Sequence, residues 1–214
     1  MEAPILFGAF YLVQRILKDM IKAMNPPNQQ IETIYVNYFD SIDESKTKAL
    51  MAICSDIVAK QKPHTLYFLF SSMGGSVNAG ITLYNFLRSL PVEIIMHNNG
   101  SIDSIANVIF LAAPKRYAAK HSSFLFHGIN WNFPQGASLT FNQLTETLSR
   151  FKTEETKVAY IVSERTQMTE TEIRELFRQG ETKDLQFAID KGIIHEIRDP
   201  VIPKDAPLIT VNLN

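Results

Sequence analysis

Three polar features of the sequence interrupt apolar stretches at points where chemistry could occur. Two adjacent glycines, Gly74 and Gly75, follow the apolar run TLYFLF and precede a helical pattern. Ser104 follows the next apolar run and begins another helical pattern, and His127 ends the segment SSFLFH. A glycine turn between a strand and a helix can bring backbone N–H groups to a phosphate or an oxyanion, or can simply satisfy an unusual backbone angle. A serine at a helix start is either an N-cap or a nucleophile that the helix dipole assists.

In chain order, these features provide the groups that an acyl-transfer reaction requires. The glycine turn would supply the oxyanion donors, Ser104 the nucleophile and His127 the general base. The turn lacks the Gly-Lys-Ser/Thr sequence of a Walker-type phosphate loop, which favours the oxyanion. A lone histidine after an apolar strand is also a common structural residue, so each feature keeps its structural explanation. The remaining histidines lack the spacing of metal ligands, and we expect no metal site and no cofactor: His64, His97, His121 and His195.

The composition indicates one globular domain. The chain has 214 residues, of which 45% are hydrophobic and 20% charged, and its formal net charge is -1. These values suit a sizeable core and give no sign of nucleic-acid binding. A single cysteine, Cys54, excludes an internal disulfide and fits a reducing, cytoplasmic compartment. Because Cys54 lies in an amphipathic helical pattern, we expect a buried structural thiol.

Strand-like and helix-like patterns alternate along the chain, which predicts an α/β domain with largely parallel strands. We expect strands in TIYVNYF, TLYFLF, VEIIMH, KRYAAKHSSFLFHG (two short ones) and GIIHEI. The segment from Ser104 is apolar nearly all round, which predicts a fully buried helix. A long helix is expected from Ser138 to Arg165, and Thr169 with Glu172 forms a capping box for the helix after it.

The two ends of the chain are assigned separately. We expect an amphipathic helix and a linker in residues 1–30. The main domain is expected in residues 31–199, and a C-terminal tail in residues 200–214. The N-terminal apolar run is interrupted by Arg15, Lys18 and Asp19, so it is too short to span a bilayer, and it has no basic leader typical of a signal peptide. Its apolar face could pack on the main domain, on a neighbouring subunit or on a membrane surface.

Several motifs together resemble the proteolytic subunit of the Clp protease, ClpP, over roughly Ile34 to Ile197. SSMGGSVNAG is similar to the family's S-P-G-G-S-V-x-A-G, and GSIDSIANVIFLAAPKRYA to its nucleophile helix and following strand. HSSFLFHG is similar to N-S-x-x-M-I-H, and QGASLTFNQL to the opening of the family's handle helix. DLQFAIDKGIIHEI is similar to A-x-E-A-x-x-Y-G-L-I-D-x-I.

The resemblance implies a ClpP/crotonase-like fold of stacked strand–strand–helix units, with a protruding handle helix at about residues 138–165. It implies Ser104 as the nucleophile, His127 as the base, and the N–H groups of Gly75 and Ile105 as the oxyanion hole. By the same resemblance, the substrates are peptides or unfolded proteins. The subunits would assemble into seven-membered rings that pair through their handles and enclose the active sites.

The sequence departs from the family pattern at four places. Met73 replaces a proline in the glycine turn, and Asp103 places a negative charge beside Ser104. The N-terminal amphipathic helix replaces a short axial-pore segment, which puts docking of a Clp ATPase in doubt. Aligning TETEIRELFRQG with the family's E-x-I-x-x-D-x-x-R-D puts Leu176 where the third member of the triad, an aspartate, belongs.

Loss of the acid would weaken the reaction, because it removes the group that fixes the histidine tautomer and stabilises its charged form, a loss of about 10⁴-fold in kcat. Glu175, Glu172 or Asp184 could substitute after a local shift, but one residue along a helix turns a side chain by about 100°. A Ser–His pair oriented by a backbone carbonyl or a side-chain amide is a further possibility.

Four functions follow from these features. A weakened ClpP-like serine peptidase is the first, and a catalytically inactive ClpP-like structural or regulatory subunit is the second. A crotonase-type acyl-CoA enzyme shares the fold and the oxyanion hole but does not need the Ser104–His127 pair. A Ser–Lys peptidase would need Lys115 or Lys157 near Ser104.

Overall fold

The computed structural model describes residues 32–130 and 135–211. The chain divides into two compact units, Met1–Ile31 and Glu32–Asn214. The helix and linker predicted for residues 1–30 therefore lie outside the described residues. The elements of the second unit, in chain order, are β1 (Thr33–Phe39), α2 (Glu44–Gln61), β2 (Thr65–Ser72), α3 (Val77–Ser89), β3 (Glu93–Asp103), α4 (Ala106–Phe110), β4 (Lys115–Ala118), β5 (Ser123–Leu125), α5 (Phe141–Arg165), α6 (Glu170–Gln179), β6 (Thr182–Lys183), α7 (Leu185–Asp190), β7 (Glu196–Ile197) and β8 (Leu208–Thr210).

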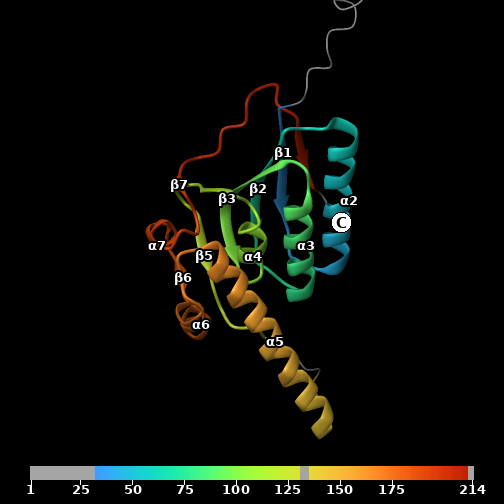
Figure 1. The fold of residues 1–214 in the computed structure, drawn as a ribbon, viewed down its shortest axis with the longest axis vertical. Helices are drawn as coiled ribbons and strands as arrows, with labels where there is room; N and C mark the ends of the chain where they lie inside the picture. The colour runs from blue at the N-terminus through green and yellow to red at the C-terminus, as the bar shows by residue number, and fades with distance from the viewer. Residues whose placement is uncertain (1–31, 131–134, 212–214) are drawn as a thin grey trace, which may run out of the picture. The chain divides into compact units, whose positions relative to one another are not determined.

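One sheet organises this unit, with the strand order β6-β5-β3-β2-β1-β8. Off this path, β4 pairs with β3, and β7 pairs with β4. All its pairs are parallel except β5 with β6. The central strand β2 is buried along almost its whole length, which explains its continuous apolar sequence. In Figure 1, α2 and α3 lie to the right of β2 and β3, and α6 and α7 lie to the left, beside β5 and β6. The structure confirms the predicted α/β class.

The C-terminal segment differs from its description as a tail. Strand β8 lies within residues 200–214 and extends the sheet by pairing in parallel with β1, from Tyr35 opposite Leu208 to Asn37 opposite Thr210. The sequence LIT is too short for its period to distinguish a strand from a loop, and its partner strand is far away in the sequence.

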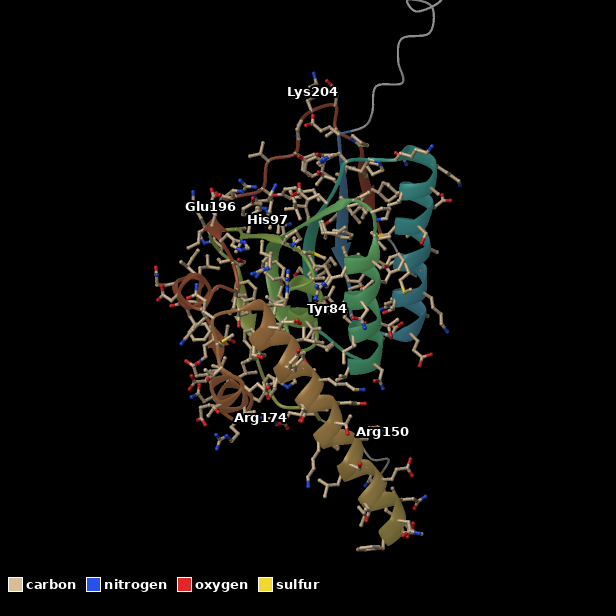
Figure 2. The ribbon with its side chains drawn as sticks, in the orientation of Figure 1. Tyr84, His97, Arg150, Arg174, Glu196 and Lys204 are labelled. Carbon is tan, nitrogen blue, oxygen red and sulfur yellow. The ribbon has the colours of Figure 1, made fainter. Side chains whose placement is uncertain are left out.

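Helix α5 is the predicted handle, and it extends away from the sheet in Figure 1. It begins at Phe141 rather than Ser138, because Thr140 and Gln143 form a capping box that sets the first turn. Its second half packs on the domain through Val158 and Val162, whereas its first half is exposed. Arg150 marks this projecting half in Figure 2.

The helix after the handle begins and ends as the sequence predicts. Thr169 and Glu172 form its capping box, and Gly180 ends it in the left-handed conformation with φ 61°. An ion pair between Arg174 and Glu155, 2.7 Å long, ties α6 to α5. This packing matters for the site, because α6 lies against the segment after β5.

The single cysteine lies where the sequence predicts, inside a helix of this domain. Cys54 is fully buried in α2, and burial raises the pKa of its thiol to about 12, so it is not a reactive thiolate. Within the described part of the chain, no helix is both long and apolar enough to cross a membrane.

Candidate active site

The parallel pairing of β3 and β5 brings Ser104 and His127 to the same edge of the sheet. Asp103 lies opposite Leu125, and the Ser104 N–H donates to the Leu125 carbonyl at 2.9 Å. His127 follows Leu125 by two residues, so both side chains emerge just beyond the ends of neighbouring strands. Both line one small pocket of about 20 Å³.

The backbone of Ser104 is held in a conformation that ordinary residues avoid. Its φ is 57°, and Lys62 is the one other non-glycine residue with a positive φ in the described part of the chain. Such a conformation costs about 1–3 kcal/mol and persists only where the surroundings impose it. It places Ser104 on a sharp turn between β3 and α4, with its side chain facing the pocket rather than the sheet.

The two glycines explain how the β2–α3 turn can lie against Ser104. A Cβ on Gly74 would lie 2.7 Å from the Cβ of Ser104, closer than real Cβ atoms approach, and the φ of Gly74 is 84°. A Cβ on Gly75, whose φ is 148°, would lie 2.1 Å from the carbonyl oxygen of Ile42. Only glycine fits at either position, and the result is a backbone in direct contact with the serine.

Two backbone N–H groups beside Ser104 have no acceptor among the described residues. On either side of Gly75, the Gly74 carbonyl accepts from Ile42 at 2.8 Å and the Ser76 N–H donates to Ile42 at 2.7 Å, but the Gly75 N–H is unused. The Ile105 N–H is unused because Ile105 precedes the first turn of α4. Ile105 lines the pocket of Ser104, so its N–H is available to an oxyanion formed there. Gly75 is not among the lining residues, although its neighbour Gly74 lies against Ser104, and the oxyanion role of the Gly75 N–H stays a prediction.

The His127 ring is oriented by a backbone carbonyl. Its Nδ1 lies 2.7 Å from the carbonyl oxygen of Gly128, which requires the proton on Nδ1 and leaves Nε2 as an acceptor. This is the tautomer that a general base for serine needs. Neither His127 Nε2 nor Ser104 Oγ hydrogen-bonds to any described residue, so the two side chains share the pocket without a bond between them. Bonds of this kind often tighten only when substrate binds.

The acids proposed as substitutes for a triad aspartate all have other partners. Glu172 belongs to the capping box of α6 and pairs with Lys191 at 2.8 Å. The ion pair with Lys191 and the hydrogen bonds from Thr169 lower the pKa of Glu172 to about 2. Glu175 pairs with Arg178 at 2.5 Å. Asp184 caps α7 by accepting from the Phe187 N–H at 2.8 Å. None of the three lines the pocket of Ser104.

Leu176 itself is buried in α6 with 7% of its surface exposed. Its equivalence to the family's triad aspartate stays a prediction. The Asp103 carboxylate, which we expected beside the serine, accepts a hydrogen bond from Ser101 Oγ at 2.5 Å.

The lysines of the Ser–Lys alternative also lie elsewhere. Lys115 pairs with Glu93 at 2.7 Å, and Lys157 lines a polar groove along α5 that is separate from the pocket of Ser104. Among the described residues, no group of three or more His, Cys, Asp or Glu side chains is placed to hold a metal ion.

The walls of the pocket are mostly apolar and come from four elements and a loop. Besides Ser104, Ile105, Asn107 and His127, the lining residues are Val77, Phe126, Ile129, Val158, Val162 and Phe177. The Phe177 carbonyl accepts from the Gly128 N–H at 3.0 Å, so α6 fixes the residue whose carbonyl orients His127. The arrangement combines a serine, an oriented histidine and the free N–H of Ile105 around a pocket that would hold about one water molecule.

Sequence reasoning missed two contributors to this site. The sequence could not single out the Gly128 carbonyl, because every residue carries one. Asn107 had a visible signal, since it is a polar residue in the otherwise apolar run IANVIFLAA. The run as a whole predicts only a buried helix.

Comparison with known proteins decides the family. The family model for the Clp protease matches residues 19–201 of this chain. The chain belongs to the Clp protease family. It is 25% identical over 148 residues to an ATP-dependent Clp protease proteolytic subunit 1 from Leifsonia xyli, a match that covers 68% of this chain and 73% of that protein. It is 26% identical over 161 residues to a Clp protease proteolytic subunit from Chlorella vulgaris, covering 73% of this chain and 77% of the other.

Other Clp comparisons are shorter or structural. The match with the Clp protease proteolytic subunit of Bigelowiella natans, 28% identical over 91 residues, covers 42% of this chain and spans only 47% of that protein. Among solved structures, a ClpP1 mutant from Listeria monocytogenes superposes with a TM-score of 0.63 at 18% identity, over 79% of this chain and 92% of the other. This superposition confirms the ClpP-like fold.

Proposed function

We propose that this Clp family member is a serine peptidase that cleaves peptide bonds through an acyl-enzyme. The observation that carries the proposal is the left-handed Ser104, which shares a pocket with an oriented His127 and with Ile105, whose backbone N–H is unused. Backbone strain at a functional side chain is typical of active sites, since a purely structural N-cap does not need it.

The groups of this site have distinct roles in such a reaction. Ser104 Oγ bonds to the substrate carbonyl carbon while its proton passes to His127 Nε2, and the N–H groups of Gly75 and Ile105 bind the oxyanion. Collapse breaks the C–N bond, and His127 gives the proton to the leaving amine. A water molecule then repeats the sequence against the acyl-enzyme, releasing the carboxylic acid and restoring Ser104.

We expect the reaction to be slow for a triad-type enzyme. The His127 Nδ1 has a neutral carbonyl as its partner, and a carbonyl stabilises the imidazolium less than a carboxylate does. This neutral partner also favours the second candidate function, a structural or regulatory subunit without activity of its own. The crotonase-type alternative is disfavoured by membership of the Clp family and by the Ser104–His127 pair.

Labelling with a serine-directed fluorophosphonate tests the proposal directly. Native protein should be modified at Ser104, as located by peptide mass spectrometry, and Ser104→Ala should not be labelled. Heat-denatured protein provides the background for non-specific reaction. Folded wild-type protein that gives no labelling above this background would support the structural subunit instead.

The handle supports assembly with further copies of this chain. Phe141, Leu144 and Leu148 follow one another along one face of α5 and are 82%, 50% and 55% exposed. Three large apolar side chains in a row on a projecting helix favour a partner that covers them. A ring of seven subunits, and a pair of such rings, are proposed by resemblance to the family. Docking of a Clp ATPase, which the N-terminal segment puts in doubt, does not form part of the proposal.

Analytical ultracentrifugation tests the assembly. The wild type should sediment as an oligomer at micromolar concentration, and the double variant Leu144→Glu/Leu148→Glu should shift it to smaller species. Thr153→Glu, an exposed residue that lines the polar groove of α5, is the control and should leave the assembly intact. A wild-type monomer at these concentrations would contradict the proposal.

A further inference from the structure

Asn107 is a buried amide in a helix whose other residues are apolar. It is 1% exposed, and its neighbours Ala106, Val108, Ile109 and Phe110 are all fully buried. A buried amide loses its hydration, so it belongs in such a helix only where its hydrogen bonds do something that an apolar side chain cannot. Asn107 also lines the pocket of Ser104 and His127.

The side chain of Asn107 joins the two strands that carry the proposed nucleophile and base. Its Nδ2 donates to the Ser104 carbonyl at 3.0 Å and to the Leu125 carbonyl at 2.8 Å. The Leu125 carbonyl also accepts from the Ser104 N–H at 2.9 Å, and the Ser104 carbonyl also accepts from the Asn107 N–H at 3.1 Å. Both peptide groups that flank the Ser104 Cα are therefore held by these bonds.

Stability alone does not explain this residue. The Oδ1 of Asn107 is buried and has no hydrogen-bond partner among the described residues. An unpaired buried acceptor is a cost to folding that alanine or valine at the same position would avoid. The amide therefore combines a penalty at one end with two bonds at the other, and those two bonds converge on a strained serine backbone.

We propose that Asn107 is a positioning residue for the nucleophile, which rests on the proposed function of Ser104. By holding the Ser104 and Leu125 carbonyls together, its amide keeps φ of Ser104 in the left-handed region. It also fixes Ser104 against the strand that leads, two residues after Leu125, to His127. A displacement of about 1 Å between a nucleophile and its base costs about 10²-fold in rate. The two hydrogen bonds of the Asn107 amide should therefore affect the rate of reaction at Ser104.

The rate of fluorophosphonate labelling at Ser104, expressed per folded molecule, tests the proposal. Asn107→Ala should reduce the rate constant by about 10–100-fold. Asn107→Ser, whose hydroxyl can still donate to the Ser104 carbonyl, should fall between alanine and wild type. With a peptide substrate, the loss should appear in kcat while KM stays within about twofold, because the clamp acts on the reacting serine rather than on binding.

Thr47→Ala provides a matched control. Thr47 is also buried, at 4% exposed, and also has an unpaired polar atom, but it lies in α2 and does not line the pocket. It should label at the wild-type rate. An Asn107→Ala protein that is folded and labels within about twofold of wild type would overturn the proposal, since a purely structural role changes the folded fraction and not the rate per molecule.

Hydrogen exchange separates this proposal from the function on which it rests. The Ser104 N–H should exchange at least about 10-fold faster in Asn107→Ala than in the wild type, while amides of β1 and β2 are unchanged. Unchanged exchange at Ser104 would overturn the positioning role whether or not the protein is a peptidase. If wild-type Ser104 is never labelled, the peptidase proposal fails and exchange alone decides the role of Asn107. Should Asn107→Ala fail to fold, Asn107→Ser undergoes the same two measurements.

Discussion

Two histidines of the sheet, His97 in β3 and His127 after β5, have opposite surroundings. His97 is fully buried, its Nδ1 accepts from the Tyr67 hydroxyl at 2.7 Å and its Nε2 donates to the Arg198 carbonyl at 2.9 Å. His127 is partly exposed and uses only Nδ1, leaving Nε2 facing a pocket. A histidine whose two nitrogens are both bonded within the fold is held in one orientation, whereas one with a free nitrogen can exchange a proton with a substrate.

The packing around the two rings differs in the same way. The ring of His97 lies in a row of aromatic rings, 5.9 Å from Tyr67 and 6.1 Å from Tyr117 between centroids. The guanidinium carbon of Arg198 lies 3.4 Å from the centroid of the Tyr117 ring, so it covers the last ring of this row. Figure 2 shows His97 inside the domain, close to the C-terminal segment that carries Glu196. In the region of Ser104 and His127, by contrast, the backbone N–H groups of Gly75 and Ile105 have no acceptor among the described residues.

The largest expected effect separates the two histidines. His127→Ala should reduce labelling of Ser104 and peptide cleavage by at least about 10³-fold, with little change in stability, because it removes the base. His97→Ala should leave labelling and cleavage per folded molecule nearly unchanged and should lower the stability of the fold. It removes the partners of the Tyr67 hydroxyl and the Arg198 carbonyl and should lower the free energy of unfolding by about 2–4 kcal/mol.

Labelling kinetics and urea denaturation on both variants measure this difference. Equal losses of activity in the two variants, after correction for the folded fraction, would show that the contrast between the histidines is wrong. A stable, fully active His127→Ala protein would instead remove His127 from the mechanism.

A smaller effect is expected from giving His127 a charged partner. Leu176→Asp should raise kcat by about 10-fold or more, against a limit of about 10⁴-fold for a complete triad, if its carboxylate reaches Nδ1. The buried charge should also lower stability by up to a few kcal/mol where the pairing is imperfect. Leu176→Asn, nearly the same size and neutral, is the control and should give little gain.

The acids of the wild type provide the counter-test. Asp184→Asn keeps the N-cap of α7, because asparagine caps as well as aspartate, so neither stability nor activity should change much. Glu175→Gln removes only a surface ion pair and should be equally mild. A fast wild type whose activity either substitution abolishes would mean that a substitute acid completes the triad.

The sequence could predict the elements and the candidate residues better than their geometry. The capping box at Thr169 and the left-handed Gly180 depend only on residues near each helix end, so the ends of α6 are predictable from the sequence. Ser104 and His127 were found because polar residues interrupt apolar runs at strand ends. The register of Asp103 opposite Leu125 is a pairing between distant segments, and local patterns do not determine it.

Other features depend on neighbours that the sequence does not place. The strand β8 is formed by three residues whose partner is β1, at the other end of the domain. The Nδ1 partner of His127 is a carbonyl, which is invisible to any search for side-chain types. A backbone carbonyl that orients a base can therefore be found only in the folded structure, whereas glycines in a turn can point to backbone N–H donors from the sequence.

The smallest expected effect concerns protonation of His97. Burial lowers the pKa of His97 below its usual value, and the nearby positive charge of Arg198 acts in the same direction, although the Arg198 carbonyl, Asp199 and Glu196 oppose it. Between the lowered pKa and the value of about 6.5 in the unfolded chain, the unfolded chain binds more protons. Stability is therefore full above pH 6.5, falls as the pH drops toward the folded pKa, and is constant below it as far as His97 is concerned.

Urea denaturation at several pH values between about 5 and 7.5 would measure this contribution. The wild type should lose stability on acidification through this range, and His97→Gln should show a shallower dependence because the titrating group is gone. His121→Gln, which removes an exposed histidine, is the control and should keep the wild-type slope. If His97→Gln retained the full slope, the acid sensitivity would come from other groups.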